Sequence, residues 1–374
     1  MTLPSNEGVV FIPGLMGFGR FGSAAAPVIQ YFDHVLDDFD VPDIRERCIF
    51  HEPPPTGSLS ARVSSLARAL DQALSSSPRR GRPPPTKWHL VGHSTGGLDA
   101  RLLVNRLYSG IGGPTASEKA PLLARIGNVV SISAPLRGAP IAARVGRHAD
   151  GALDYPVTLL LRAAYGLSIA HELRHAGLRV RLASALLGQS WGRALANVDW
   201  RVAEQLDRFF SSIREDHHLL RDLEPATMFD LNQRIARGDC HTIHSFATVS
   251  PPPRLRLSGA GDALVSRAIY AAAHHYARPT ARDEAPFPFV PYADWIGALD
   301  TRFETPDAND GIVPTASQMY DGPGRRFAVL GDHLDVVGHF KGVGETFFKS
   351  DANMDRPRFR RLWKRVLEVL RMTN

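Results

Sequence analysis

Residues 88–98 read Trp-His-Leu-Val-Gly-His-Ser-Thr-Gly-Gly-Leu, and within this stretch a strand pattern gives way to a helix pattern. The apolar run 88–91 predicts a short buried strand, and the spacing over 98–107 predicts a helix. Between them, residues 92–96 have the spacing Gly-x-Ser-x-Gly. A serine on a sharp strand-to-helix turn needs small neighbours, because the flanking backbones pass close to it. Although this pentapeptide also occurs in turns with an idle serine, its position favours Ser94 as a nucleophile.

Other apolar runs place this unit in a larger sheet. Amphipathic helices are predicted over 58–76 and 356–372, and the Pro-rich stretch 251–300 is predicted to be irregular. Because strand and helix patterns alternate, the fold class is expected to be α/β, with a mostly parallel sheet flanked by helices. Buried strands are predicted at four further apolar runs: residues 8–12, 127–133, 242–249 and 327–330.

Residues 141–235 break this alternation. They are rich in Leu, Ala and Arg at helical spacing and contain no convincing strand. We therefore expect residues 1–374 to form a single α/β domain, with 141–235 inserted as a large helical lid or cap. Its apolar residues, such as those at 157–161, either pack as ordinary core or cover the serine and receive an acyl chain.

Composition limits the remaining function classes. Lys and Arg total 44 against 38 Asp and Glu, a net charge of +6, but the basic residues are dispersed, which argues against nucleic-acid binding. Cys48 and Cys240 are too few for a disulfide framework or a thiolate metal site. The chain shows no signal-peptide pattern and no apolar run of about 18 residues, so no transmembrane segment is expected. A cytoplasmic protein is the default expectation, leaderless secretion stays open, and the sequence does not indicate the oligomeric state.

A nucleophilic serine needs a base and an acid that orients the base. In hydrolases whose serine lies on a strand-to-helix turn of this kind, the three residues occur along the chain in the order serine, acid, histidine. Asp310 lies in a turn-like Asn-Asp-Gly segment, and His333 follows the predicted strand 327–330. These two residues are the predicted acid and base for Ser94, with Asp307 and His339 as their alternatives.

The negative charge that forms during acyl transfer needs two amide donors. One is predicted to be the backbone N–H of Thr95, directly after the serine. The loop 13–17, which follows the first strand, is the natural source of the second. We assign it to the N–H of Leu15, with Met16 as the alternative.

These motifs together resemble the bacterial lipases of the α/β-hydrolase fold. In that family an apolar strand leads to a His-Gly-apolar-x-Gly oxyanion loop, which here reads Pro-Gly-Leu-Met-Gly at 13–17. The resemblance implies a lid, an acyl-enzyme mechanism and no required cofactor. Pro13 and Leu136 replace family histidines, which affects loop geometry and substrate fit rather than the triad. The other segments that carry the resemblance are residues 91–101, 133–138, 222–232, 309–311 and 333–335.

Some members of that family bind a structural Ca²⁺ through the Asp of the His-Leu-Asp motif and an upstream Asp. Asp335 matches the first ligand, and Asp300 is a poorly placed match for the second. The resemblance therefore implies a possible structural calcium site, and no other metal.

Two competing motifs point to other chemistry. Residues 17–22 satisfy Gly-x-Gly-x-x-Gly, but a dinucleotide site would place its first glycine directly at the strand end, whereas residues 13–16 intervene. Residues 171–175 read His-Glu-Leu-Arg-His, which on a helix could hold zinc. A third ligand is required, and Glu204 is only a loose match. Both motifs are therefore minor alternatives.

The expected function is hydrolysis of a carboxylic ester with a hydrophobic acyl group or of a polyester, by a lipase- or esterase-type serine hydrolase. The expected partner is thus a hydrophobic ester, including one at a lipid or polymer interface. Three alternatives stay open: an acyltransferase that uses the same triad, a non-catalytic binding protein of the same fold, and a zinc hydrolase.

Overall fold

A seven-stranded sheet forms the centre of the molecule. The computed structural model describes residues 3–15, 17, 20–22, 27–32, 34–36, 44–75, 85–109, 115–146, 218–254, 261–279, 294–296, 305–340 and 350–372. The strand order is β4-β1-β5-β6-β7-β9-β8, and every neighbouring pair is parallel. The strands are β1 (Glu7–Ile12), β4 (Cys48–Phe50), β5 (Lys87–His93), β6 (Ile126–Ile132), β7 (Ile243–Val249), β8 (Asp294–Ile296) and β9 (Arg326–Leu330); β2 (Arg20–Gly22) and β3 (Pro27–Gln30) pair separately and antiparallel.

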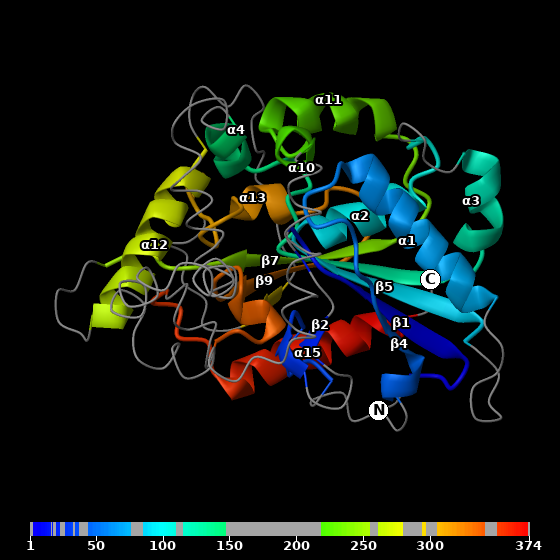
Figure 1. Ribbon diagram of the computed structural model, residues 1–374, viewed down its shortest axis with the longest axis horizontal. Coiled ribbons are helices and arrows are strands. Elements are labelled where there is room, and N and C mark those ends of the chain that lie inside the picture. The colour runs from blue at the N-terminus through cyan, green and yellow to red at the C-terminus, as the bar shows by residue number, and fades with distance from the viewer. Residues whose placement is uncertain are drawn as a thin grey trace, which may run out of the picture.

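Helices cover both faces of this sheet (Figure 1). One face carries α15, drawn red, and the other carries α1 and α2. This arrangement confirms the predicted fold class, a mostly parallel sheet flanked by helices. The α-helices are α1 (Leu59–Leu74), α2 (Thr95–Val104), α3 (Ala116–Leu123), α4 (Pro140–Gly146), α10 (His218–Asp222), α11 (Pro225–Ile235), α12 (Gly261–Ala277), α13 (Thr315–Gln318) and α15 (Arg356–Leu370); short 3-10 helices are formed by Ile44–Arg47 and Asp335–Val337.

Two hydrophobic cores explain why the apolar runs form strands. In β1, Val9 and Phe11 pack into the core beneath α15, whereas Val10 and Ile12 pack into the core beneath α1 and α2. Successive side chains of a strand point to opposite faces, so a strand covered on both faces is apolar throughout. The amphipathic α15 closes the first core with its apolar stripe, which includes Trp363.

Several predicted boundaries need correction. The helix predicted over 98–107 begins earlier, at Thr95, because the turn at Ser94 leads directly into α2. The prediction that 251–300 is irregular is wrong: α12 and β8 lie within it, and the prolines mark only the flanks of an Ala-rich helix. The predicted lid or cap at 141–235 is described only at its ends, in α4, α10 and α11, and residues 147–217 lie outside the described residues.

The topology places the candidate site. From β1 the chain adds β4 on one side, and β5 then pairs with β1 on the other side. The loops after β1 and β5 therefore diverge at a switch point, where parallel α/β sheets form their ligand crevice. These are the loops that carry Leu15 and Ser94. Among the described residues, no helix is long and apolar enough to cross a lipid bilayer.

Candidate active site

Ser94 occupies a strained turn between β5 and α2. Its backbone lies at φ 56° and ψ −132°, in the positive-φ region that non-glycine residues rarely adopt. Such a conformation costs on the order of 1–3 kcal/mol and persists where the surroundings enforce it. The backbones around this turn pass close together, since a Cβ at Gly96 would clash with the carbonyl of Ile12 at the end of β1. The Ser94 side chain makes no capping hydrogen bond to α2, and its hydroxyl is therefore not used by the helix.

The loop after β1 lies directly against Ser94. A Cβ at Gly14 would stand 2.9 Å from Ser94 Oγ and 2.8 Å from the Tyr31 hydroxyl, so only glycine fits there. The Gly14 N–H donates to the Tyr31 hydroxyl at 2.9 Å and is not a free oxyanion donor. Leu15, whose N–H is the predicted oxyanion donor, follows Gly14 in this loop, and Met16 lies outside the described residues.

His333 and Asp310 form a buried pair. The His333 Nδ1 and Asp310 Oδ2 atoms are 2.8 Å apart, and the exposed fractions of the two side chains are 5% and 0%. The His333 N–H also donates to the Asp310 carbonyl at 3.0 Å, so backbone and side chain hold the two residues together. Because a carboxylate only accepts, Nδ1 carries the proton and Nε2 is left as an acceptor. Asp307 is exposed, and the structure therefore pairs His333 with Asp310 rather than with the alternative acid.

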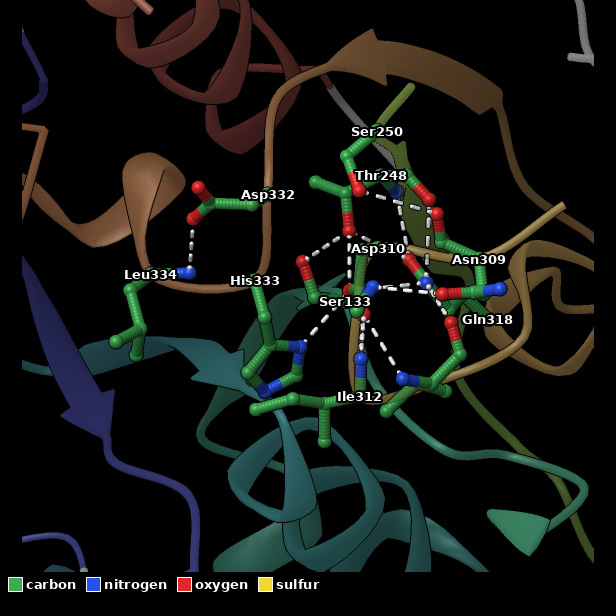
Figure 2. A network of polar contacts seen from close by, with 12 residues as sticks. Ser133, Thr248, Ser250, Asn309, Asp310, Ile312, Gln318, Asp332, His333 and Leu334 are labelled. Carbon is green, nitrogen blue, oxygen red and sulfur yellow. Dashed lines mark hydrogen bonds and ion pairs between the residues drawn. The ribbon is translucent and has the colours of Figure 1, made fainter. Parts of the chain in front are cut away.

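Both carboxylate oxygens of Asp310 accept hydrogen bonds from surrounding donors (Figure 2). Figure 2 shows His333 and Gln318 approaching its carboxylate from opposite sides. The turn that presents it is favoured by Gly311, whose φ is 94°. Five donors reach the carboxylate: His333 Nδ1 (2.8 Å), Thr248 Oγ1 (2.6 Å) and Gln318 Nε2 (3.1 Å) at Oδ2, and the amides of Ile312 (3.0 Å) and Val313 (2.8 Å) at Oδ1.

Ser94 and His333 are linked through the residue before the serine. His93 Nε2 donates to the His333 carbonyl at 2.9 Å, and the centroids of the two imidazole rings are 4.7 Å apart. His333, the predicted base, therefore lies next to the strand end that carries Ser94. His339, the alternative base, places its Nε2 2.8 Å from the Tyr31 carbonyl.

Sequence patterns missed several residues that surround this site. Arg62 of α1 is fully buried and donates to the Pro13 carbonyl at 2.8 Å, which ties the loop after β1 to α1. It also makes a 2.7 Å ion pair with Asp99 of α2. Thr248 and Gln318 support Asp310, as described above. Arg62, Thr248 and Gln318 belong to no motif, and a buried cation inside an otherwise amphipathic helix is not visible in a helical pattern.

The predicted calcium ligands are only partly described. Asp300 lies outside the described residues, and Asp335 is buried with its Oδ2 accepting from the Asp332 amide at 2.9 Å. Burial, followed by the charge of Asp332, raises the pKa of Asp335 well above its usual range. Within the described part of the chain, no three His, Cys, Asp or Glu side chains cluster as metal ligands, and the calcium site stays a prediction because Asp300 lies outside that part.

The arrangement provides the parts that acyl transfer needs. It offers a hydroxyl on a tight turn, a neighbouring imidazole whose tautomer is fixed by a carboxylate, and a loop pressed against the hydroxyl. The residues of the zinc motif, His171 to His175 and Glu204, lie outside the described residues.

Comparisons with known proteins find distant structural similarity and no sequence match. No family model matches the chain, and no curated protein matches it in sequence. Its solved structural neighbours are bacterial lipases and esterases, among them the Staphylococcus hyicus lipase (16% identity, TM-score 0.48, covering 98% of this chain and 94% of that one). Lipase 1 from Pelosinus fermentans is similar at 15% identity and TM-score 0.48, covering 99% and 100% of the two chains. EstA from Clostridium botulinum is similar at 18% identity and TM-score 0.47, covering 96% and 87%. These values are too low to carry a functional assignment.

Proposed function

We propose that this protein is a serine hydrolase of carboxylic esters, related to the bacterial lipases of the α/β-hydrolase fold. The observation that supports this most is the buried His333–Asp310 pair beside the strained turn of Ser94. The hydrophobic character of the ester is inferred from the apolar residues of the predicted lid.

The proposed reaction proceeds through an acyl-enzyme. Ser94 Oγ attacks the ester carbonyl while His333 Nε2 takes the hydroxyl proton, and Asp310 stabilises the imidazolium that forms. The amides of Leu15 and Thr95 receive the negative charge of the tetrahedral intermediate. His333 then protonates the leaving alcohol as the carbon–oxygen bond breaks. Water repeats the sequence on the acyl-enzyme, which releases the acid and restores Ser94.

A fluorophosphonate probe tests the nucleophile. We expect the wild-type protein to be labelled at Ser94, and the Ser94→Ala variant to lose labelling and about a millionfold in ester turnover. Ser245→Ala is the matched control, since Ser245 is a fully buried serine of β7 whose Oγ accepts a long, 3.3 Å hydrogen bond from the Tyr320 amide. Near-normal turnover of Ser94→Ala refutes the mechanism, and absence of wild-type labelling identifies a non-catalytic binding protein.

A substrate panel separates the remaining alternatives. We expect hydrolysis of p-nitrophenyl esters of increasing chain length, of an emulsified triglyceride or of a polyester. Transfer of the acyl group to added alcohols instead of water identifies an acyltransferase. Complete loss of activity with EDTA, restored by zinc, would favour the His171–His175 motif, whereas calcium-restored stability would support the Asp335 site.

A further inference from the structure

A chain of buried hydrogen bonds joins the loop beside Ser94 to the loop that carries His333. The Gly14 amide lies 2.9 Å from the Tyr31 hydroxyl, and this hydroxyl lies 2.7 Å from His93 Nδ1. His93 Nε2 lies 2.9 Å from the His333 carbonyl. Tyr31 and His93 are 6% and 0% exposed, so water does not compete for these bonds.

The direction of every proton in this chain is determined. The His333 carbonyl can only accept, so His93 Nε2 carries a proton. Burial lowers the pKa of His93 well below its usual range, and the ring is therefore neutral with Nδ1 as an acceptor. The Tyr31 hydroxyl donates to that Nδ1 and accepts from the Gly14 amide. Each hydrogen bond in this chain therefore has one donor and one acceptor assigned.

The same two residues meet the base loop at two further points. The His93 and His333 rings pack with centroids 4.7 Å apart, and His339 Nε2 donates to the Tyr31 carbonyl at 2.8 Å. Tyr31 is therefore bonded at its hydroxyl to the Gly14 loop and at its backbone to the segment that follows His333. Movement of either loop relative to the other would break buried hydrogen bonds.

We propose that Tyr31 and His93 are positioning residues that set the oxyanion loop and the general base as one unit. This inference rests on the proposed ester hydrolysis. Acyl transfer needs the amide after Gly14 and the imidazole of His333 at fixed places around one carbonyl, and a displacement of about 1 Å can cost on the order of a hundredfold in rate. Neither residue touches the reacting atoms in the proposed mechanism.

The test uses Tyr31→Phe, His93→Gln and the double variant. Phe removes only the hydroxyl, and Gln keeps a donor towards the His333 carbonyl while losing the Nδ1 acceptor. We expect each single variant to lower kcat about tenfold with KM changed less than about twofold. The double variant is expected to match the worse single variant, because both substitutions break one chain.

Tyr320→Phe is the matched control. Tyr320 is also a buried tyrosine, and its hydroxyl donates a single 2.9 Å hydrogen bond to Asp239. We expect this variant to lose stability without losing kcat. The proposal is overturned if Tyr31→Phe lowers kcat no more than Tyr320→Phe does, or if the two single effects multiply in the double variant. Circular dichroism identifies folded variants, and Tyr31→Phe alone suffices if His93→Gln does not fold.

A nuclear magnetic resonance measurement separates this inference from the proposed function. In the wild type we expect His93 as the neutral Nε2–H tautomer. In Tyr31→Phe we expect a shifted and faster-exchanging Nδ1 proton of His333. An unchanged His333 signal contradicts the positioning role even in a fully active enzyme. The opposite outcome is also distinguishable. If the wild type does not react with fluorophosphonate but the His93 and His333 signals behave as expected, the proposed function is wrong and the coupling of the two loops still holds.

Discussion

At the scale of single residues, the surroundings of Asp310 favour one role for its buried carboxylate, that of a hydrogen-bond acceptor. All of its five hydrogen-bonding neighbours are donors, and it is fully buried. These donors favour an ionised carboxylate at position 310, which only accepts hydrogen bonds. They disfavour a side chain that carries a hydrogen-bond donor of its own. A neutral side chain of the same shape would turn one of its hydrogens against the donors that surround it.

Asp310→Asn is therefore expected to lower kcat about ten-thousandfold, because the amide cannot hold His333 in the required tautomer. Ester turnover at saturating substrate measures this. Asp307→Asn is the control, since Asp307 is exposed, and its activity should equal that of the wild type. Equal losses in the two variants would remove Asp310 from the mechanism.

Thr248 supports Asp310 from behind. Its hydroxyl donates to Asp310 Oδ2 at 2.6 Å, and the Ser133 hydroxyl lies 2.8 Å from the same oxygen of Thr248. Thr248→Val keeps the shape and removes the donor. We expect kcat to fall about tenfold, which corresponds to about 1.4 kcal/mol of transition-state stabilisation. Ser245→Ala, on the same strand, should show no such fall; a fall of equal size there would indicate general damage to β7.

At the scale of elements, Arg62 joins three segments around Ser94. Its guanidinium donates to the Pro13 carbonyl, to the Pro54 carbonyl at 2.9 Å and twice to Asp99. It thus couples α1, α2 and the loop after β1. Burial raises the pKa of Asp99, and the charge and hydrogen bonds of Arg62 oppose that rise.

Arg62→Leu is expected to lower the free energy of unfolding by about 3–5 kcal/mol, because it leaves the Asp99 charge buried without its partner. The loss should be larger at pH 8 than at pH 5, since an Asp99 with a further raised pKa can be neutralised by protonation at low pH. Urea unfolding at both pH values measures this. The double variant Arg62→Leu, Asp99→Leu should regain part of the loss, and no recovery would contradict the ion-pair explanation.

At the scale of the whole molecule, buried titratable groups set the response to acid. In the unfolded chain a histidine titrates near 6.5, but in the described part of the folded chain burial lowers several histidine pKa values, three of them to about 4. Buried carboxyls act in the opposite sense: burial raises the pKa of Asp332 to about 6, and also raises those of Asp99 and Asp335. The histidines with lowered pKa values are His51, His89, His93, His241, His244 and His274.

The free energy of unfolding should consequently fall as the pH drops from 6.5 towards 4. Below 6.5 the unfolded state binds protons at six histidines that the folded state excludes, whereas three carboxyls bind protons more readily in the folded state. The six groups outnumber the three, so acid destabilises the fold. Urea titrations at steps of pH across this range measure the slope. A flat or rising stability would mean that the carboxyls dominate.

Local sequence patterns predicted most strands of the main sheet and the candidate site residues. The apolar runs identified β1, β5, β6, β7 and β9, since a strand covered on both faces must be apolar throughout. The spacing around Ser94, the turn at Asp310 and the loop after β9 predicted three site residues. The structure pairs His333 with Asp310 and places His333 against His93, the residue before Ser94. The short strands β4 and β8 were not predicted, because three residues are too few to show a recognisable strand pattern.

The buried polar partners could be decided only by tertiary structure. Tyr31 meets His93 across 62 residues, and His93 meets the His333 carbonyl across 240. A strand or helix pattern is written in neighbouring residues, whereas the partner of a buried hydroxyl, imidazole or guanidinium is whichever group the packed chain brings within about 3 Å. For this reason Ser94, Asp310 and His333 could be proposed as a candidate nucleophile, acid and base from short stretches, while the side chains packed around them appeared only when the sheet and its helices were assembled.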